Sequence, residues 1–457
     1  MRTISLNFQV HPPLRLRTYR FFDIGNDHYY YDDFTNESRI RRKAERCYLP
    51  TNTILLDTIK EYGSRFKVSF VISGTAIDLF KLYAPEVLDS FRELVKTGCV
   101  ELLSEPISHS LVSLIDQETF KQQLNEHSDI MYKHFKQRPK TLVNTALLYS
   151  NAIGEMAYEI GYKTVLTEAT RHILGWKSPN YVYFNASNPK QKILFRNCNL
   201  SDDLSLRFNT RNWSEYPLTA EKYARWIKNI DPKEEHINIF IDYETFGEIH
   251  APETGIINFL KALPKTIFSE TEIGFCTCAE AAERLQPVGG IDVPYPITWA
   301  DAEKDTSAFL GNDMQQEAFA KLQMLNKAIE KITDKGLRKD WKYLQAADHL
   351  YYMSTKFFAE GRFHSMYNPY SSPYEAFINY MNVLNDMLIQ VENYTGGSIG
   401  IPTTTGLKAV TDKETSTTKT KKTKEKSSTV KEREKKKKKV NASTPKTTKE
   451  KKPVKKN

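Results

Sequence analysis

Strand-like and helix-like segments alternate through the first three hundred residues of this chain. The strand candidates are short, apolar and rich in β-branched residues, and helical periodicity follows most of them. Consecutive strands that are joined by helices run parallel, and a set of this size can close into a barrel. We therefore predict an α/β fold built on a parallel barrel, with an open doubly wound sheet as the alternative. The strand candidates are Ile4–Val10, Val68–Ser73, Cys99–Ser104, Leu142–Leu148, Thr164–Thr167, Leu204–Phe208, Ile237–Tyr243 and Ile273–Cys278.

The pattern changes after about residue 300. Before that point, the helical segments are Ala76–Lys96, Gln117–Phe135, Ala152–Ile160, Ala220–Ile230 and Thr254–Leu263. After it, three long periodic segments have no strand pattern between them, namely Thr306–Asp334, Leu337–Glu360 and Pro373–Tyr394. We predict a barrel domain over residues 1–300 and a helical domain over residues 301–402 that contributes to the site.

Residues 403–457 form a basic tail. Lys, Thr, Ser and Glu dominate it and large apolar residues are almost absent, so we predict that it is disordered. Residues 411–457 alone hold 19 basic and 6 acidic residues, whereas the whole chain has a net charge of +9. The remaining body is therefore slightly acidic and needs no nucleic-acid partner. We expect a solvated tail, with contact to an anionic partner as the alternative.

The sequence shows no feature of export, membrane insertion or cofactor binding. The first ten residues resemble a strand and lack the segments of a signal peptide. No apolar run approaches the roughly 20 residues that span a bilayer. The five cysteines lack metal-ligand spacing, and no Gly-x-Gly-x-x-Gly follows a strand. We expect a cytoplasmic protein with reduced thiols, no membrane contact, no metal and no cofactor.

Polar side chains follow several predicted strands. Ile237–Tyr243 is an apolar strand that ends in Asp242 and Glu244, and alternation places these two carboxylates on one side. The carboxyl ends of parallel barrel strands meet at one mouth, where catalytic groups are found. Asp348 and Tyr352 share a helix face in the C-terminal half, and we expect this face to pack against the mouth. The other candidate site residues are His11, Glu105, His109, Glu168 and Trp176.

Five stretches, taken in order, resemble the motif regions of glycoside hydrolase family 57, a family of α-amylase type. The resemblance covers about residues 1–400. It implies an incomplete (β/α)7 TIM-like barrel, a following helical domain, and an α-1,4-glucan or maltooligosaccharide as ligand. The stretches are VHPP at 10–13, GCVE with SHSL between 98 and 111, NTAL at 144–147, DYETFGE at 242–248 and ADHLYY at 347–352.

The resemblance also implies a retaining mechanism, in which two carboxylates about 5 Å apart flank the scissile bond. The acid/base residue of the family falls on Asp242, whose burial can hold its proton until the leaving oxygen takes it. The family's nucleophile is a Glu, and the matching position here is Ala146. A methyl group cannot attack an anomeric carbon. Pro12 in place of Gln and Ile249 in place of His are further departures at the same mouth.

These residues leave three functional hypotheses. The first is an active glucan hydrolase or transferase whose nucleophile has moved to Glu168, at the end of the next strand. The second is an amylase-like protein with lost or impaired catalysis that still binds α-glucan. The third is a metal-dependent polysaccharide deacetylase, for which His11, His109 and Asp242 supply only a loose cluster. We favour the second hypothesis, because the departures from the family fall together at one site.

Overall fold

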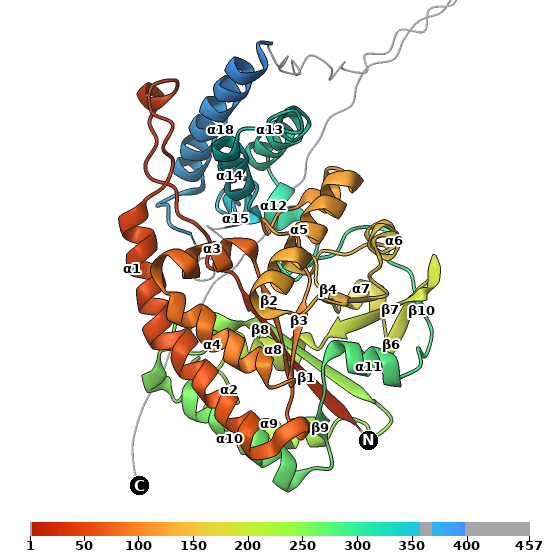
Figure 1. Cartoon of the computed structure of the whole chain (residues 1–457). Helices are drawn as coiled ribbons and strands as arrows, with labels where there is room; N and C mark the ends of the chain where they lie inside the picture. The colour runs from red at the N-terminus through yellow and green to blue at the C-terminus, as the bar shows by residue number, and fades with distance from the viewer. Residues whose placement is uncertain (1, 357–367, 398–457) are drawn as a thin grey trace, which may run out of the picture. The chain divides into compact units, whose positions relative to one another are not determined.

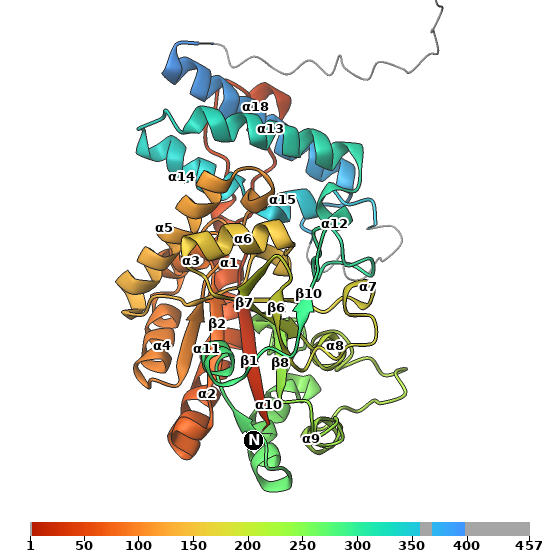
Figure 2. The ribbon, with the colours of Figure 1, turned by 90° about the vertical axis from the view of Figure 1, so that its right-hand side faces the viewer.

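A closed ring of seven parallel strands lies at the centre of the residues that the computed structural model describes, 2–356 and 368–397 (Figures 1 and 2). β1 pairs with β2 on one side and with β8 on the other. A bridge from Ser104 to Leu142 joins β3 to β4, and the pair Arg196–Asn238 joins β7 to β8. The ring confirms the predicted α/β barrel. Its strands are β1 (Thr3–Val10), β2 (Val68–Ile72), β3 (Val100–Leu103), β4 (Thr141–Leu142), β5 (Thr164–Glu168), β7 (Asn188–Arg196) and β8 (His236–Asp242).

Alternation along the strands separates the apolar core from the barrel interior. All eight residues of β1 are buried. Asn7 and Gln9 face the interior, where Gln9 Nε2 donates to Glu105 Oε1 at 3.2 Å and Asn7 Oδ1 accepts from the Cys278 thiol. The same period of two turns His11 inward at the end of the strand. The intervening residues pack with helix side chains in the core; they are Ile4, Leu6, Phe8 and Val10.

The predicted strand Leu204–Phe208 is wrong. Its first residues belong to helix α8 (Cys198–Ser205). The Asn197 side chain caps this helix by accepting from the backbone N–H of Leu200. Leu200 and Leu204 are four residues apart and both buried, which is helical spacing. The short window seen in the sequence contained too little of this pattern to distinguish it from a strand.

The barrel strand β7 was missed from the sequence. It forms an antiparallel hairpin with β6 (Val182–Asn185), outside the barrel ring. Its first residues, Asn188 to Lys192, are polar or proline, and they mask the apolar run that ends the strand. Two short strands complete the sheet, β9 (Gly274–Phe275) beside β1 and β10 (Gly290–Ile291) beside β6.

Helices cover the outside of the barrel (Figure 1). The predicted helix Ala76–Lys96 is in fact two helices, because Ala84 leaves helical geometry, with φ of −153° and ψ of 63°, and Pro85 begins a new helix. Within the described ranges, every helix is too short or too polar to cross a membrane. These helices are α1 (Asp33–Lys43), α2 (Leu49–Tyr62), α3 (Gly74–Tyr83), α4 (Pro85–Lys96), α5 (Gln117–Phe135), α6 (Asn151–Ile160), α7 (Arg171–Leu174), α8, α9 (Ala220–Lys228), α10 (Ile256–Glu270) and α11 (Cys278–Arg284).

A group of helices follows residue 300 and lies beyond the carboxyl ends of the barrel strands (Figure 2). Both parts belong to one compact unit. The end of the predicted helix Leu337–Glu360 and the whole tail 403–457 lie outside the described residues. The helices are α12 (Ser307–Leu310), α13 (Asp313–Ile329), α14 (Lys335–Leu344), α15 (Ala347–Tyr351) and α18 (Pro373–Thr395).

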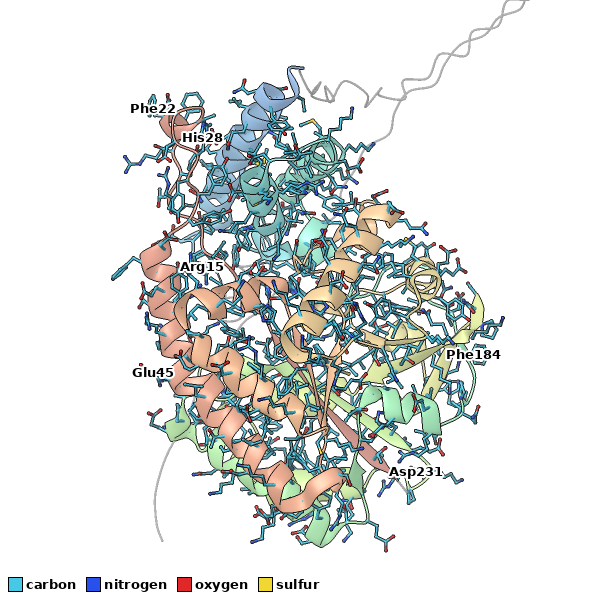
Figure 3. All side chains as sticks on the ribbon, in the orientation of Figure 1. Arg15, Phe22, His28, Glu45, Phe184 and Asp231 are labelled. Atoms are coloured by element: carbon cyan, nitrogen blue, oxygen red, sulfur yellow. The ribbon has the colours of Figure 1, made fainter. Side chains whose placement is uncertain are left out.

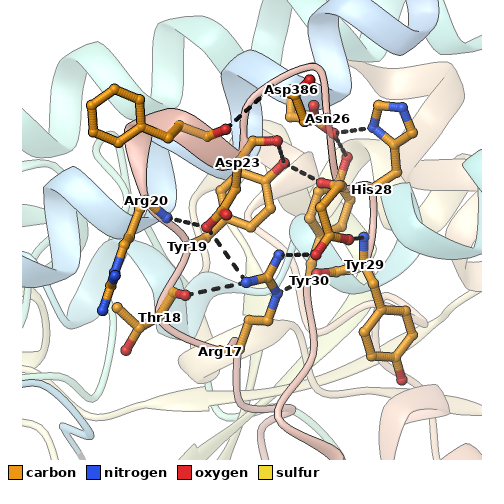
Figure 4. A network of polar contacts seen from close by, with 12 residues as sticks. Arg17, Thr18, Tyr19, Arg20, Asp23, Asn26, His28, Tyr29, Tyr30 and Asp386 are labelled. Carbon is orange, nitrogen blue, oxygen red and sulfur yellow. Dashed lines mark hydrogen bonds and ion pairs between the residues drawn. The ribbon is translucent and has the colours of Figure 1, made fainter.

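The segment between β1 and α1 is attached to α18 by a buried carboxylate, Asp386 (Figure 4). Asp386 accepts hydrogen bonds from the Gly25 backbone N–H at 2.7 Å and from the Tyr30 hydroxyl at 2.6 Å. His28 Nδ1 lies 2.8 Å from the same side chain. Because this segment begins at His11, the Asp386 contacts also fix the chain that forms one wall of the barrel mouth.

Candidate active site

A cavity of about 750 Å³ lies at the carboxyl ends of the barrel strands. Its wall combines strand ends, helix α1 and helix α15, so the C-terminal helices take part in it. Glu105 is fully buried behind the wall, whereas Glu168 and Trp176 do not line the cavity. The predicted site residues that do line it are His11, His109, Ala146, Asp242, Glu244, Asp348 and Tyr352.

Asp242 and Glu244 reach the cavity by different routes. Asp242 is the last residue of β8, and the backbone then tightens into a short 3₁₀ turn over Tyr243–Thr245 that carries Glu244. Lys43 Nζ lies 3.2 Å from Glu244 Oε1, and the Tyr48 hydroxyl donates to the same oxygen. Burial alone would raise the pKa of Glu244, but Lys43 and Tyr48 hold it below its usual range. Glu244 is therefore a paired carboxylate held in its ionised form, which does not suit a proton donor.

Two histidines from different strand ends are stacked in the cavity wall. The rings of His11 and His109 have centroids 3.8 Å apart and planes inclined by 20°. His11 Nε2 lies 2.8 Å from Asp348 Oδ2, and its Nδ1 lies 2.8 Å from Ser73 Oγ. Burial would raise the pKa of Asp348, but His11 and His109 hold it well below its usual range. The histidine pair thus joins the barrel mouth to helix α15.

His109 is oriented by a buried carboxylate. Its Nδ1 lies 2.6 Å from Glu105 Oε2, and Glu105 is fully buried. Burial lowers the pKa of His109, but Glu105 outweighs it, with help from Asp348 and Asp242, so the pKa is raised overall. The backbone at His109 is also left-handed, with φ of 51°. Such strain in a non-glycine residue is typical of a position that the surrounding structure holds for function.

His11, His109 and Asp348 are close enough together to be considered as ligands of a metal ion. One ligand atom from each lies within 4.8 Å of the others. The sequence suggested Asp242 as the acid of this group, but Asp348 is the one that completes it. The two imidazole planes are nearly parallel, so their in-plane lone pairs do not converge on one ion as tetrahedral coordination requires. The residues fit a chain of hydrogen bonds better than a metal centre.

Ala146 lies in a tight turn directly after β4. Its backbone is left-handed, with φ of 53° and ψ of 31°, and that of Leu147 is also left-handed. Asn144 braces the turn by donating to the Leu148 carbonyl at 3.0 Å and accepting from the Thr145 N–H. Ala146 is 6 % exposed and lines the cavity. The turn therefore presents position 146 to the cavity, but without a reactive group.

Glu168, the candidate for a relocated nucleophile, is fully buried below the cavity. Arg196 Nη1 lies 3.1 Å from Glu168 Oε2, and a second arm of this guanidinium binds Asp202. Burial raises the pKa of Glu168, and Arg196 opposes that effect. Arg196 itself lines the cavity, whereas Glu168 does not. Glu168 in this position is paired with Arg196 and does not line the cavity.

Sequence reasoning missed several residues of the cavity wall. Trp176 was predicted as a site residue, but it is 93 % exposed and does not line the cavity, so its role stays a prediction. Trp299 lines the cavity instead, and the Arg196 guanidinium lies over its ring at 5.7 Å. The position of Trp299 in the sequence, just before the C-terminal helices, was a signal that could have suggested its place in the cavity wall. The basic residues Arg15, Arg39 and Lys43 were also missed, because they follow no strand directly.

The fold and the cavity together define a glycosidase-type parallel barrel whose mouth is completed by C-terminal helices. The sequence pattern of Glycosyl hydrolase family 57 matches residues 5–294, and the chain belongs to this family. A protein of Methanocaldococcus jannaschii named "Putative alpha-amylase" is 40 % identical over 396 residues, which cover 84 % of this chain and 83 % of that protein.

Solved structures of the family share the fold at low sequence identity. A branching enzyme from Thermococcus kodakaraensis is 13 % identical, with a TM-score of 0.58, over 87 % of this chain and 96 % of its own. An α-amylase from Thermotoga maritima is 14 % identical, with a TM-score of 0.56, over 87 % of this chain and 97 % of its own. A 4-α-glucanotransferase from Thermococcus litoralis is 16 % identical, with a TM-score of 0.58. The match covers 76 % of this chain but only 56 % of that enzyme.

Proposed function

We propose that this chain binds α-1,4-glucans in the barrel cavity and that its glycosidase chemistry is lost or impaired. The observation that carries the proposal is Ala146, which lines the cavity where the family has its nucleophile. The names of the similar proteins, an amylase, a branching enzyme and a glucanotransferase, support α-glucan as the ligand class. The remaining polar groups of the wall, above all His11, His109 and Asp348, are suited to hydrogen bonds with sugar hydroxyls.

The other departures support the same proposal. Pro12 is buried and offers no side-chain donor or acceptor. Ile249 lines the cavity at the position of the family's His, so an apolar group replaces a polar one. His250, one residue on, does not line the cavity, and its Nε2 lies 2.9 Å from the Ser205 carbonyl. The neighbouring histidine therefore does not take over the missing role.

The alternatives are weaker on specific contacts. A nucleophilic Glu168 would have to leave its ion pair with Arg196 and move into a cavity that it does not line. A metal-dependent deacetylase would have to unstack His11 and His109 before both could ligate one ion. Metal analysis of the purified chain separates the deacetylase from the two glucan-active hypotheses.

Azide tests the proposal on the unaltered chain. It can occupy the space of the missing carboxylate and bond to the anomeric carbon of maltopentaose. The bond between the anomeric carbon and the leaving oxygen then breaks, and Asp242 gives its proton to that oxygen. The products are a β-glycosyl azide and a shorter maltooligosaccharide. We expect maltopentaose to bind, no hydrolysis without azide, and a glycosyl azide detectable by mass spectrometry with it. Asp242→Asn, which removes the proton donor, should abolish the azide product.

Each outcome of this experiment bears on a different part of the proposal. Failure of maltopentaose to bind would refute the glucan-binding function itself. Binding with rapid hydrolysis in the absence of azide would refute the loss of catalysis. Binding of maltopentaose with no azide product would leave the binding function in place. It would mean that the substitutions at Pro12 and Ile249 also prevent the reaction.

A further inference from the structure

A half-buried arginine of helix α1, Arg39, lines the cavity without an acidic partner. Among the described residues it forms no ion pair, and its one hydrogen bond is a long contact of 3.4 Å from Nη1 to the Pro13 carbonyl. Its neighbours on the same wall differ, since Lys43 pairs with Glu244 and Arg42 pairs with Glu248. A guanidinium withdrawn from water in this way is costly unless an anion or other acceptor meets it.

A second arginine brings more positive charge to the same place. Burial lowers the pKa of Arg39 to about 10, and the nearby charges of Arg15 and Arg42 contribute to that shift. Arg15 also lines the cavity, and its guanidinium lies 5.4 Å from the centre of the Tyr352 ring. Figure 3 marks Arg15 near the N-terminal end of α1. Arg15 and Arg39 are two positive charges on the same part of the cavity wall, and an anion bound between them would interact favourably with both.

The hydroxyl of Tyr352 is an independent sign of a missing ligand at this point. Tyr352 is 3 % exposed, lines the cavity, and in the described part of the chain its buried hydroxyl has no hydrogen-bond partner. Both Arg15 and Arg39 act electrostatically on this hydroxyl, which places the three side chains close together. Most buried polar groups in folded proteins are hydrogen-bonded, so an unsatisfied hydroxyl on a cavity wall indicates a ligand atom.

We propose that Arg39, Arg15 and Tyr352 form a subsite for an anionic group carried by the glucan, a phosphate ester or a carboxylate. The inference rests on the proposed glucan-binding function and narrows its ligand class. A guanidinium fork binds two oxygens of a phosphate or carboxylate side by side, and the Tyr352 hydroxyl donates to another oxygen. A neutral glucan would leave the positive charge of Arg39 uncompensated.

Isothermal titration calorimetry of the full chain tests the subsite. The ligands are maltotriose, maltotriose phosphorylated at one C6 hydroxyl, and maltotriose oxidised to a carboxylate at one C6. We expect at least one anionic ligand to bind about 10- to 100-fold more tightly than maltotriose, the range of one or two charge-assisted hydrogen bonds. The preferred anion distinguishes a phosphoglucan from an acidic glucan. Equal affinity for all three ligands would overturn the subsite but not the glucan-binding function.

Two variants assign the preference to these residues. Arg39→Gln should weaken the anionic ligand more than it weakens maltotriose, so that most of the advantage of the anionic ligand is lost. Arg41→Gln is the matched control, because Arg41 lies on the same helix but forms an exposed pair with Glu37. Tyr352→Phe removes only one hydroxyl, so it should keep the fold and weaken the anionic ligand more than it weakens maltotriose. If the anionic preference survives both Arg39→Gln and Tyr352→Phe, the assignment is wrong.

Discussion

The backbone N–H of Trp299 donates a hydrogen bond of 3.0 Å to the carbonyl of Ala146. This contact ties the turn at position 146 to the segment that leads into the C-terminal helices. The left-handed backbone of Ala146 is therefore held from outside the turn, and no contribution of its own side chain is needed. A left-handed alanine costs of order 1 kcal/mol relative to an ordinary conformation. The turn therefore keeps its left-handed shape with an alanine at position 146.

A glycine at this position should relieve that strain. We predict that Ala146→Gly leaves the free energy of unfolding unchanged or raises it by up to about 1 kcal/mol. The control is Ala152→Gly, at an exposed position of α6 with ordinary helical geometry. This change should lower the free energy of unfolding by about 0.5–1 kcal/mol. Urea unfolding measures both. A larger loss at position 146 than at position 152 would show that the turn is not strained.

Removing the charge of Glu168 should affect stability and not ligand binding. Glu168→Gln leaves Arg196 buried with a weaker partner, so we expect a loss of about 3 kcal/mol in the free energy of unfolding. Maltooligosaccharide affinity should change by less than about twofold, because Glu168 does not line the cavity. Glu126→Gln, at an exposed position of α5, is the control and should cost little. A measurable hydrolytic activity that disappears in Glu168→Gln would instead identify Glu168 as the nucleophile.

The pKa of His109 provides a test of the Glu105–His109 contact. NMR titration should place this pKa above its ordinary value of 6.5 in the unaltered chain. In Glu105→Gln, the largest contribution that opposes burial is lost, so the pKa of His109 should fall. His134, which contacts Arg92 and not Glu105, is the internal control and should not move.

The same contact predicts the direction of a pH effect on stability. The raised pKa of folded His109 means that its stabilising contribution is present below the unfolded pKa and is lost as pH rises through the folded pKa. Glu105→Gln should therefore cost more stability at pH 5.5 than at pH 8.5, on the basis of the reference histidine value near 6.5. An equal cost at both pH values would contradict a charged His109.

Asp386 should be a large contributor to the attachment of the β1–α1 segment. Asp386→Ala removes the acceptor of the Gly25 N–H and of the Tyr30 hydroxyl. We expect the free energy of unfolding to fall by about 3 kcal/mol. Asp129→Ala breaks an exposed pair with Arg138 and should cost no more than about 0.5 kcal/mol. Thermal and urea unfolding compare the two. Equal costs would mean that solvent or other groups replace the Asp386 contacts.

The barrel could be predicted from sequence because its strands are apolar, short and separated by clear helical patterns. Strands β1, β2, β5 and β8 lie close to their predicted bounds, and the period of two in β1 explains why His11 faces the mouth. β7 could not be predicted, because its polar start resembles a loop. Leu204–Phe208 was taken for a strand, because a window of five residues does not separate periods of 2 and 3.6.

The cavity wall was harder to predict for a related reason. Residues at strand ends can be placed from the fold class alone, and several of them do line the cavity. Arg39 and Trp299 reach it from a helix and from a long connection, so their positions depend on tertiary packing that no local pattern encodes. Trp176 shows the converse: its place after a strand suggested the mouth, whereas the short helix α7 (Arg171–Leu174) leads it away into solvent.

The most direct test of the central claim compares the unaltered chain with Ala146→Glu on maltooligosaccharides, with reducing ends measured as product. Restoring the carboxylate on the turn supplies the missing half of the pair with Asp242. We predict no detectable hydrolysis by the unaltered chain and measurable hydrolysis by Ala146→Glu, which the further change Asp242→Asn should abolish. Turnover by the unaltered chain at ordinary glycosidase rates, about 1–1000 per second, would contradict the loss of catalysis.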